Sequence, residues 1–233
     1  MKKQILAKYI FEIRYPAAAI YHDKRGTICQ KMQNDEFEHW RLDSFMVNSY
    51  NEAKTRLAFS TSKNAGMYFE FPQIDYHASL LKYIRIITRE LNLNKLSRVG
   101  LRLYLLYPKE SLDSAKEIYS KSVFNRYLDV IGNIGNTIDF GCTFDFDFDP
   151  LKGHLTFGPM DSKQLFEMFV KGEIDKENVE IPESFIFFDF DLFQVENYAF
   201  KKTDELVNHL SKYCVSAENK INQHVSQLIK SFE

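Results

Sequence analysis

The sequence predicts an α+β fold with a mainly antiparallel sheet, built from two halves that each read strand, helix, three strands and helix. Two observations carry this prediction. Segments in which apolar and polar residues alternate recur along the chain and are interrupted by segments with apolar residues at helical spacing. The 233 residues also include 21 Phe and 13 Tyr against only 9 Gly and 6 Pro, and aromatic residues are typical of sheets.

The first half begins with a predicted strand at about residues 5–15, in which Phe11 alternates with Glu12 and Arg14. A weak helical pattern follows at about residues 17–32 and contains Gly26, which lowers its helix propensity. Three strands are then predicted, at about residues 39–50, 54–62 and 65–72, and the polar turn between the last two indicates a hairpin. Trp40 lies in the first of these strands, where we expect a core position.

A helix at about residues 76–93 closes the first half. Asp75 is positioned to cap it. Its apolar residues recur every three or four positions, as an amphipathic helix requires; they are Leu80, Ile84, Ile87 and Leu91.

The second half is predicted to repeat this order. A strand at about residues 95–108 precedes a helix at about residues 111–131 and a Gly- and Asn-rich turn at residues 132–137. A hairpin around "PLKG" then joins residues 138–150 to residues 153–159. A short helix at about residues 162–171 and a strand at residues 184–195 follow.

A long C-terminal helix from about Lys202 is expected to pack on the sheet through one apolar stripe, formed by Leu206, Leu210, Tyr213, Ala217, Ile221, Leu228 and Phe232. We expect a single α+β domain over residues 1–233, with pseudo-repeat halves at about residues 1–94 and 95–233. TATA-binding-protein-like saddles and helix-grip folds share this general build, but a shared architecture does not define a function.

Charge is distributed unevenly along the chain, although its formal net value is only -2. Residues 1–138 carry 21 Lys and Arg against 14 Asp and Glu, whereas residues 139–196 carry 4 against 14. This asymmetry favours docking of the two regions against each other. The cations are spread thinly and do not cluster with aromatic residues, so nucleic acid is not the expected partner.

The cysteines and the hydropathy pattern indicate a cytoplasmic protein. Cys29, Cys142 and Cys214 are far apart and odd in number, which favours reduced thiols over a disulfide scaffold or a zinc site. There is no run of 18 apolar residues, so no membrane span is predicted. The first residues alternate like a strand and lack the apolar core of a signal peptide.

Charged residues alternate with apolar ones in three of the predicted strands. Asp145 and Asp147 alternate with phenylalanines, and Asp189 and Asp191 do the same in the last strand. In the strand at residues 95–108, one face carries charge and the other is apolar; the charged face bears Arg98, Arg102 and Tyr104. If these strands are neighbours, cross-strand Arg–Asp pairs neutralise the carboxylates on a solvated sheet face.

The alternative interpretation of the aspartates is a divalent-metal site, since hard cations prefer oxygen ligands. Alternate residues of a strand lie about 6.6 Å apart, too far for three of them to bind one ion unaided. The sequence also contains no HExxH, Walker or GxSxG motif. We therefore expect no catalytic residues, no metal and no cofactor, and a metal-dependent hydrolase or nuclease is the second hypothesis.

The segment Arg98–Tyr104, "RVGLRLY", resembles a strand shared by a sporadically distributed bacterial family of uncharacterised proteins, which reads Arg, Ile, Gly, Leu, Arg, Tyr. Similar segments in the family include the N-terminal "IFEIRYP" and a long C-terminal helix. Leu103 and Leu105 stand where the family has tyrosine and asparagine. The resemblance implies no activity, and the patchy distribution is similar to that of genes in mobile or defence loci.

The sequence thus predicts a non-enzymatic binding protein, with a protein partner and with self-association through the C-terminal helix as a further option. Its predicted contact surface is the charged sheet face, formed by Arg98, Arg102, Tyr104, Asp145, Asp147, Asp189 and Asp191. A small-ligand carrier is the third hypothesis, in which the final helix grips a curved sheet and leaves an aromatic pocket.

Overall fold

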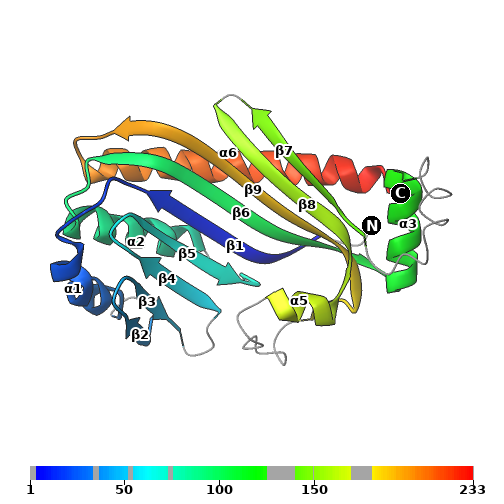
Figure 1. The fold of residues 1–233 in the computed structure, drawn as a ribbon, viewed down its shortest axis with the longest axis horizontal. Coiled ribbons are helices and arrows are strands. Elements are labelled where there is room, and N and C mark those ends of the chain that lie inside the picture. The colour runs from blue at the N-terminus through cyan, green and yellow to red at the C-terminus, as the bar shows by residue number, and fades with distance from the viewer. Residues whose placement is uncertain are drawn as a thin grey trace.

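The computed structural model describes residues 4–33, 37–51, 55–72, 76–124, 140–148, 150–168 and 180–232, without the side chains of Phe148 and Glu196. In these residues one antiparallel sheet has the strand order β2-β3-β4-β5-β1-β6-β9-β8-β7. Figure 1 shows the sheet running from β2 at the lower left to β7 at the upper right, with the long helix α6 behind it. The predicted α+β fold class, with an antiparallel sheet and a long C-terminal helix on it, is confirmed.

The described residues of the first half form five strands and two helices. Their bounds are β1 (Ile5–Arg14), α1 (Tyr21–Gln33), β2 (His39–Leu42), β3 (Val47–Tyr50), β4 (Arg56–Ser60), β5 (Asn64–Glu70) and α2 (Tyr76–Glu90).

The second half supplies four strands and three helices among the described residues. They are β6 (Lys95–Lys109), α3 (Leu112–Phe124), β7 (Cys142–Phe148), β8 (Leu151–Asp161), α5 (Ser162–Met168), β9 (Ser184–Ala199) and α6 (Thr203–Lys230).

The two halves meet at the centre of the sheet. The first strands of the halves, β1 and β6, pair with each other, and the last strands, β5 and β9, flank them. The strand order is therefore nearly symmetric about the β1–β6 pair. This placement brings charged residues of β1, β6 and β9 onto adjacent strands.

Helices α1, α2, α3 and α6 cover one face of the sheet and enclose the main core. The stripe predicted for α6 is buried at Leu206, Leu210, Tyr213, Ala217 and Ile221, and it continues through Val225 and Ile229. The apolar residues predicted for the helix at residues 76–93 are all at most 3% exposed, and the last of them, Leu91, directly follows α2. Burial of these two helical faces on the sheet removes a large apolar area from water, which is the main stabilising contribution.

The opposite face of the sheet, here called the open face, is covered by described residues at one end only. There α5 places Leu165 against a smaller apolar cluster that includes Tyr104, Leu106, Phe185 and Phe187. The rest of the open face carries the charged residues.

Three details differ from the sequence-based expectations. Residues 39–50 form two strands, β2 and β3, because Asp43 accepts a hydrogen bond from the Met46 backbone N–H and closes a tight turn. Trp40 is 49% exposed on this edge hairpin, so the core position predicted for it is wrong. Helix α1 continues through Gly26, where an added Cβ would meet no atom within 4 Å.

Two predicted features lie outside the described residues, namely the Asp75 cap and the turn at residues 132–137. Within the described ranges, no helix combines the length and the apolar character that crossing a bilayer requires.

Candidate functional site

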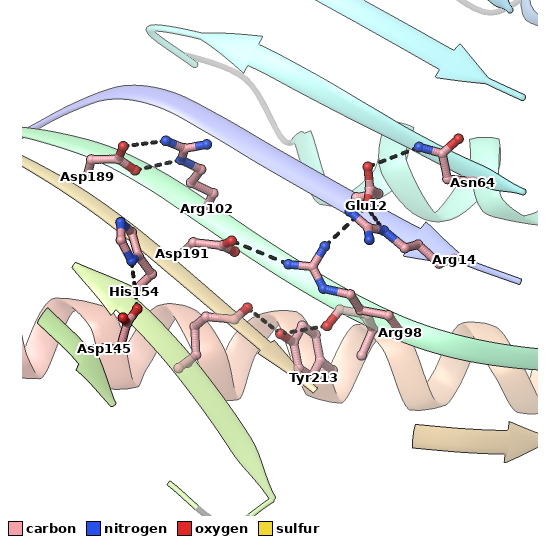
Figure 2. Close-up of polar contacts among 12 residues, drawn as sticks. Glu12, Arg14, Asn64, Arg98, Arg102, Asp145, His154, Asp189, Asp191 and Tyr213 are labelled. Atoms are coloured by element: carbon pink, nitrogen blue, oxygen red, sulfur yellow. Dashed lines mark hydrogen bonds and ion pairs between the residues drawn. The ribbon is translucent and has the colours of Figure 1, made fainter. Parts of the chain in front are cut away.

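The candidate site is a row of charged side chains across the centre of the open face (Figure 2). We call the set Glu12, Arg98, Arg102, Asp189 and Asp191 the ionic row. It spans β1, β6 and β9, which are adjacent strands. The strands carry these residues on the open face because their intervening residues, such as Leu101, Leu103 and Phe190, fill the core on the other side.

Arg102 binds Asp189 through two parallel hydrogen bonds. Its Nε donates to Oδ1 at 2.6 Å, and its Nη2 donates to Oδ2. The Asp189 side chain is only 9% exposed, whereas that of Arg102 is 41% exposed. Bidentate pairing of this kind satisfies both carboxylate oxygens and fixes the guanidinium plane.

Arg98 connects two carboxylates on different strands. Nη1 lies 3.3 Å from Glu12 Oε1 on β1, and Nη2 lies 3.4 Å from Asp191 Oδ2 on β9. The guanidinium also lies 4.3 Å from the ring centroid of Phe193, a cation–π distance. Arg98 therefore joins the first half of the chain to the second across the centre of the sheet.

Glu12 has further partners at the end of the row. Arg14 Nε donates to Glu12 Oε1 at 2.6 Å, and Asn64 Nδ2 of β5 donates to Oε2 at 3.1 Å (Figure 2). Farther along β1, Lys8 and Glu70 form a buried ion pair at 2.9 Å. The carboxylates of β1, β5 and β9 named here are thus matched by cations at hydrogen-bonding distance.

Burial and neighbouring charges both shift the pKa values of the ionisable groups in and beside the ionic row. Partial burial raises the pKa of Asp191, and the nearby Arg98 and Arg102 counteract this rise. The hydrogen bonds to Asp189 raise the pKa of Arg102. Burial, together with the charge of Asp189, raises the pKa of Tyr104. At neutral pH the guanidinium and the phenol keep their protons.

The structure brings together five of the seven predicted site residues. Arg98, Arg102, Tyr104, Asp189 and Asp191 lie on β6 and β9. Asp145 and Asp147 share the open face but sit on β7, beyond β8, so about 10 Å of sheet separates them from β9. Asp145 Oδ1 lies 2.8 Å from His154 Nδ1 and accepts its hydrogen bond, instead of pairing with an arginine.

Two participants were not predicted: Glu12 and His154. The alternation in the first strand placed Glu12 on a polar face, but only the β1–β6 pairing shows that this face adjoins Arg98. The predicted hairpin around "PLKG" would not place His154 opposite Asp145, because the strands instead close at the pair Phe148 and Leu151, so that residues 151–153 belong to β8.

A pocket of about 520 Å³ opens on the helix-covered side of β7 and β8. Aromatic and aliphatic side chains dominate its lining, which comes from the sheet, the end of α3 and the end of α6. The lining includes Phe144, Phe146, Leu155, Phe157, Phe190, His224 and Phe232.

The carboxylates of the ionic row are already engaged by cations. Across the described ranges, no three His, Cys, Asp or Glu side chains lie close enough together to hold one metal ion. The carboxylates of Asp189 and Asp191 are engaged by guanidinium groups, which compete with any cation for the same oxygens.

Comparison with known proteins adds no assignment: the chain matches no protein-family model and has no significant match among curated proteins.

Proposed function

We propose that the protein is a non-enzymatic binding protein and that the open face of its sheet contacts a protein partner. The observation that supports this is the ionic row, which combines fixed, partly exposed charges of both signs on a rigid sheet. Side chains already held in place by several partners lose little conformational freedom when a second surface docks.

The balance of charge supports a protein partner over nucleic acid. Each arginine of the ionic row lies within 3.4 Å of a carboxylate. A phosphate backbone would have to displace these carboxylates, and affinity for nucleic acid depends on cations free to neutralise phosphates. A protein surface with alternating charges can match both signs.

The cellular setting is part of the same proposal. We infer a cytoplasmic protein from its three free cysteines. Its resemblance to the sporadically distributed bacterial family suggests an accessory role in a mobile or defence-type locus. Self-association through α6 stays a prediction: the side of this helix turned away from the sheet is mainly polar, with Val215 52% exposed.

The test compares two double variants, each of which is used to co-purify partners from a lysate of the source organism. Arg102→Met with Asp189→Leu removes one ion pair of the row while leaving no single buried charge behind. Lys121→Ala with Glu117→Ala removes an exposed pair on α3 as a matched control. The proposal expects a partner, identified by mass spectrometry, that is lost with the first variant and kept with the second.

A purified reconstitution completes the test. The partner identified in this way is expressed separately, and its affinity for wild type and both variants is measured by calorimetry. A partner that binds all three proteins equally would refute the open face as the contact surface.

A further inference from the structure

Strand β7 ends the sheet in the described part of the chain, and no further strand pairs with its outer side. Its sequence, Cys142–Phe148, contains neither proline nor lysine, which often blunt an exposed edge, and its charged residues are the two aspartates. Every second residue of such a strand directs its backbone N–H and C=O away from the sheet. The edge is therefore able to accept another strand. The opposite edge, β2, offers only four residues.

The two faces of β7 differ in chemistry. On the open face Asp145 is 86% exposed at its side chain, and Asp147 is also exposed. On the other face Phe144 is 46% exposed and lines the aromatic pocket together with Phe146. An added strand would lie about 4.8 Å beyond β7, with its side chains alternating between these two surroundings.

We propose that β7 binds an extended segment of a partner protein as an additional strand, in which lysine or arginine alternates with apolar residues. The cationic side chains lie beside Asp145 and Asp147, and the apolar ones lie against Phe144 at the pocket. This inference rests on the proposed protein-binding function and names the chemistry of the partner segment.

Charge excludes a second copy of β7 as the added strand. A register that places odd residues opposite odd residues brings the Asp145 and Asp147 carboxylates of both copies together on one face, where like charges repel. If the register shifts by one residue, the aspartates of the second copy point toward the aromatic pocket, where a carboxylate loses its hydration. A cationic strand meets neither obstacle.

The probe is a seven-residue peptide with neutral ends that alternates lysine with valine and leucine. We expect it to bind the full chain, and we expect hydrogen exchange of the β7 amides to slow on binding because their outward N–H groups become paired. A second peptide has the same composition with its lysines in one block. A third replaces lysine with glutamate.

Matched variants test the charge component. Asp145→Asn and Asp147→Asn keep the shape of exposed side chains, and each should weaken peptide binding about two- to fivefold at low salt. The loss should shrink near 0.5 M salt, where screening is strong (a Debye length of about 4 Å). Asp113→Asn, on α3, serves as the control and should leave affinity unchanged.

Several outcomes would overturn the inference: equal binding of the blocked or glutamate peptide, no protection of β7, or unchanged affinity in both aspartate variants. Equal binding of the blocked peptide would mean that the pocket takes apolar groups without strand pairing. Failure of the peptide to bind leaves the Arg102 and Asp189 co-purification result intact, so the two proposals fail separately.

Discussion

The guanidinium of Arg102 binds Asp189, although the residue opposite Arg102 in the β6–β9 register is Asp191. The pairing is diagonal, because Asp189 lies opposite Tyr104. Arg98 also reaches past its own register partner, Val195, and contacts Asp191, which lies opposite Arg102. On β9, each arginine therefore neutralises a different carboxylate. The two ion pairs lie side by side on the same two strands and share no oxygen atom.

Removal of the Arg102 side chain is expected to destabilise the fold. In Arg102→Ala, the Asp189 carboxylate, which is 9% exposed in the wild type, loses both charged hydrogen bonds. We expect the free energy of unfolding to fall by about 1–3 kcal/mol, measured by urea denaturation. High salt should restore little of the loss, because ions screen a buried carboxylate poorly.

A double-mutant cycle separates the interaction energy between Arg102 and Asp189 from the cost of leaving one of these charges unpaired. Asp189→Ala and the double variant are measured beside Arg102→Ala. The double variant should be less destabilised than the sum of the two single variants. Additive losses would show that the pair contributes no coupling.

The ionisation of Asp191 should depend on Arg98. Partial burial holds the pKa of Asp191 above its usual value of about 3.9, and Arg98 limits this rise. Arg98→Met should therefore raise the pKa further, as measured by carbon-detected NMR titration of the carboxyl group. Arg85→Met, which removes a helix-surface contact with Asp204, should leave it unchanged.

The same shift has a consequence for stability. Since the folded-state pKa of Asp191 exceeds that of the unfolded chain, folding takes up a proton between the two values. The contribution of Asp191 to the free energy of unfolding is largest below about pH 4 and declines as the pH rises through the folded-state pKa. Asp191→Asn should remove this component of the pH dependence.

The hydroxyl of Tyr213 fastens α6 to the sheet. It donates to the backbone oxygen of Leu192 at 2.7 Å, with Val99 O at 3.4 Å. Tyr213→Phe keeps the ring and should lower the free energy of unfolding by about 0.5–1.5 kcal/mol. An unchanged denaturation midpoint would show that the sheet carbonyls need no partner from α6.

Two glycine substitutions should have opposite effects on stability. A Cβ at Gly66 would lie 2.2 Å from Phe11 O and 2.6 Å from Phe59 Cζ, so Gly66→Ala forces β1 or Phe59 to move. We expect a loss of at least about 2 kcal/mol. Gly26→Ala meets no atom within 4 Å and should stabilise α1 by up to about 1 kcal/mol. Thermal melts of both variants distinguish these effects.

The elements that could be predicted from the sequence are those with long, regular patterns. Helices α2 and α6 follow from apolar spacing, and the strands β1, β6 and β9 follow from strict alternation. The turn between β2 and β3 was missed although the polar pair Asp43 and Ser44 interrupts the alternation there. The deciding contact is one hydrogen bond, which the Met46 backbone N–H donates to the Asp43 side chain.

The sequence predicted that charged residues form the candidate site, but it did not predict which of them contact one another. Alternation assigned Arg98, Arg102, Asp189 and Asp191 to a polar face, which the structure places on adjacent strands. Strand order depends on packing between segments far apart in the chain, so neither the contact of Glu12 with Arg98 nor the separation of Asp145 from the ionic row could be read locally.

The pairing of β1 with β6 has a consequence for how the chain acquires its fold. β1 leaves the ribosome well before its neighbour β6 and before the helix α6, because both follow it far along the chain. Such long-range contacts carry a large loop-closure entropy and are typical of slow folding. During synthesis, one edge of β1 therefore stays open to chaperones, or to aggregation, until β6 has emerged.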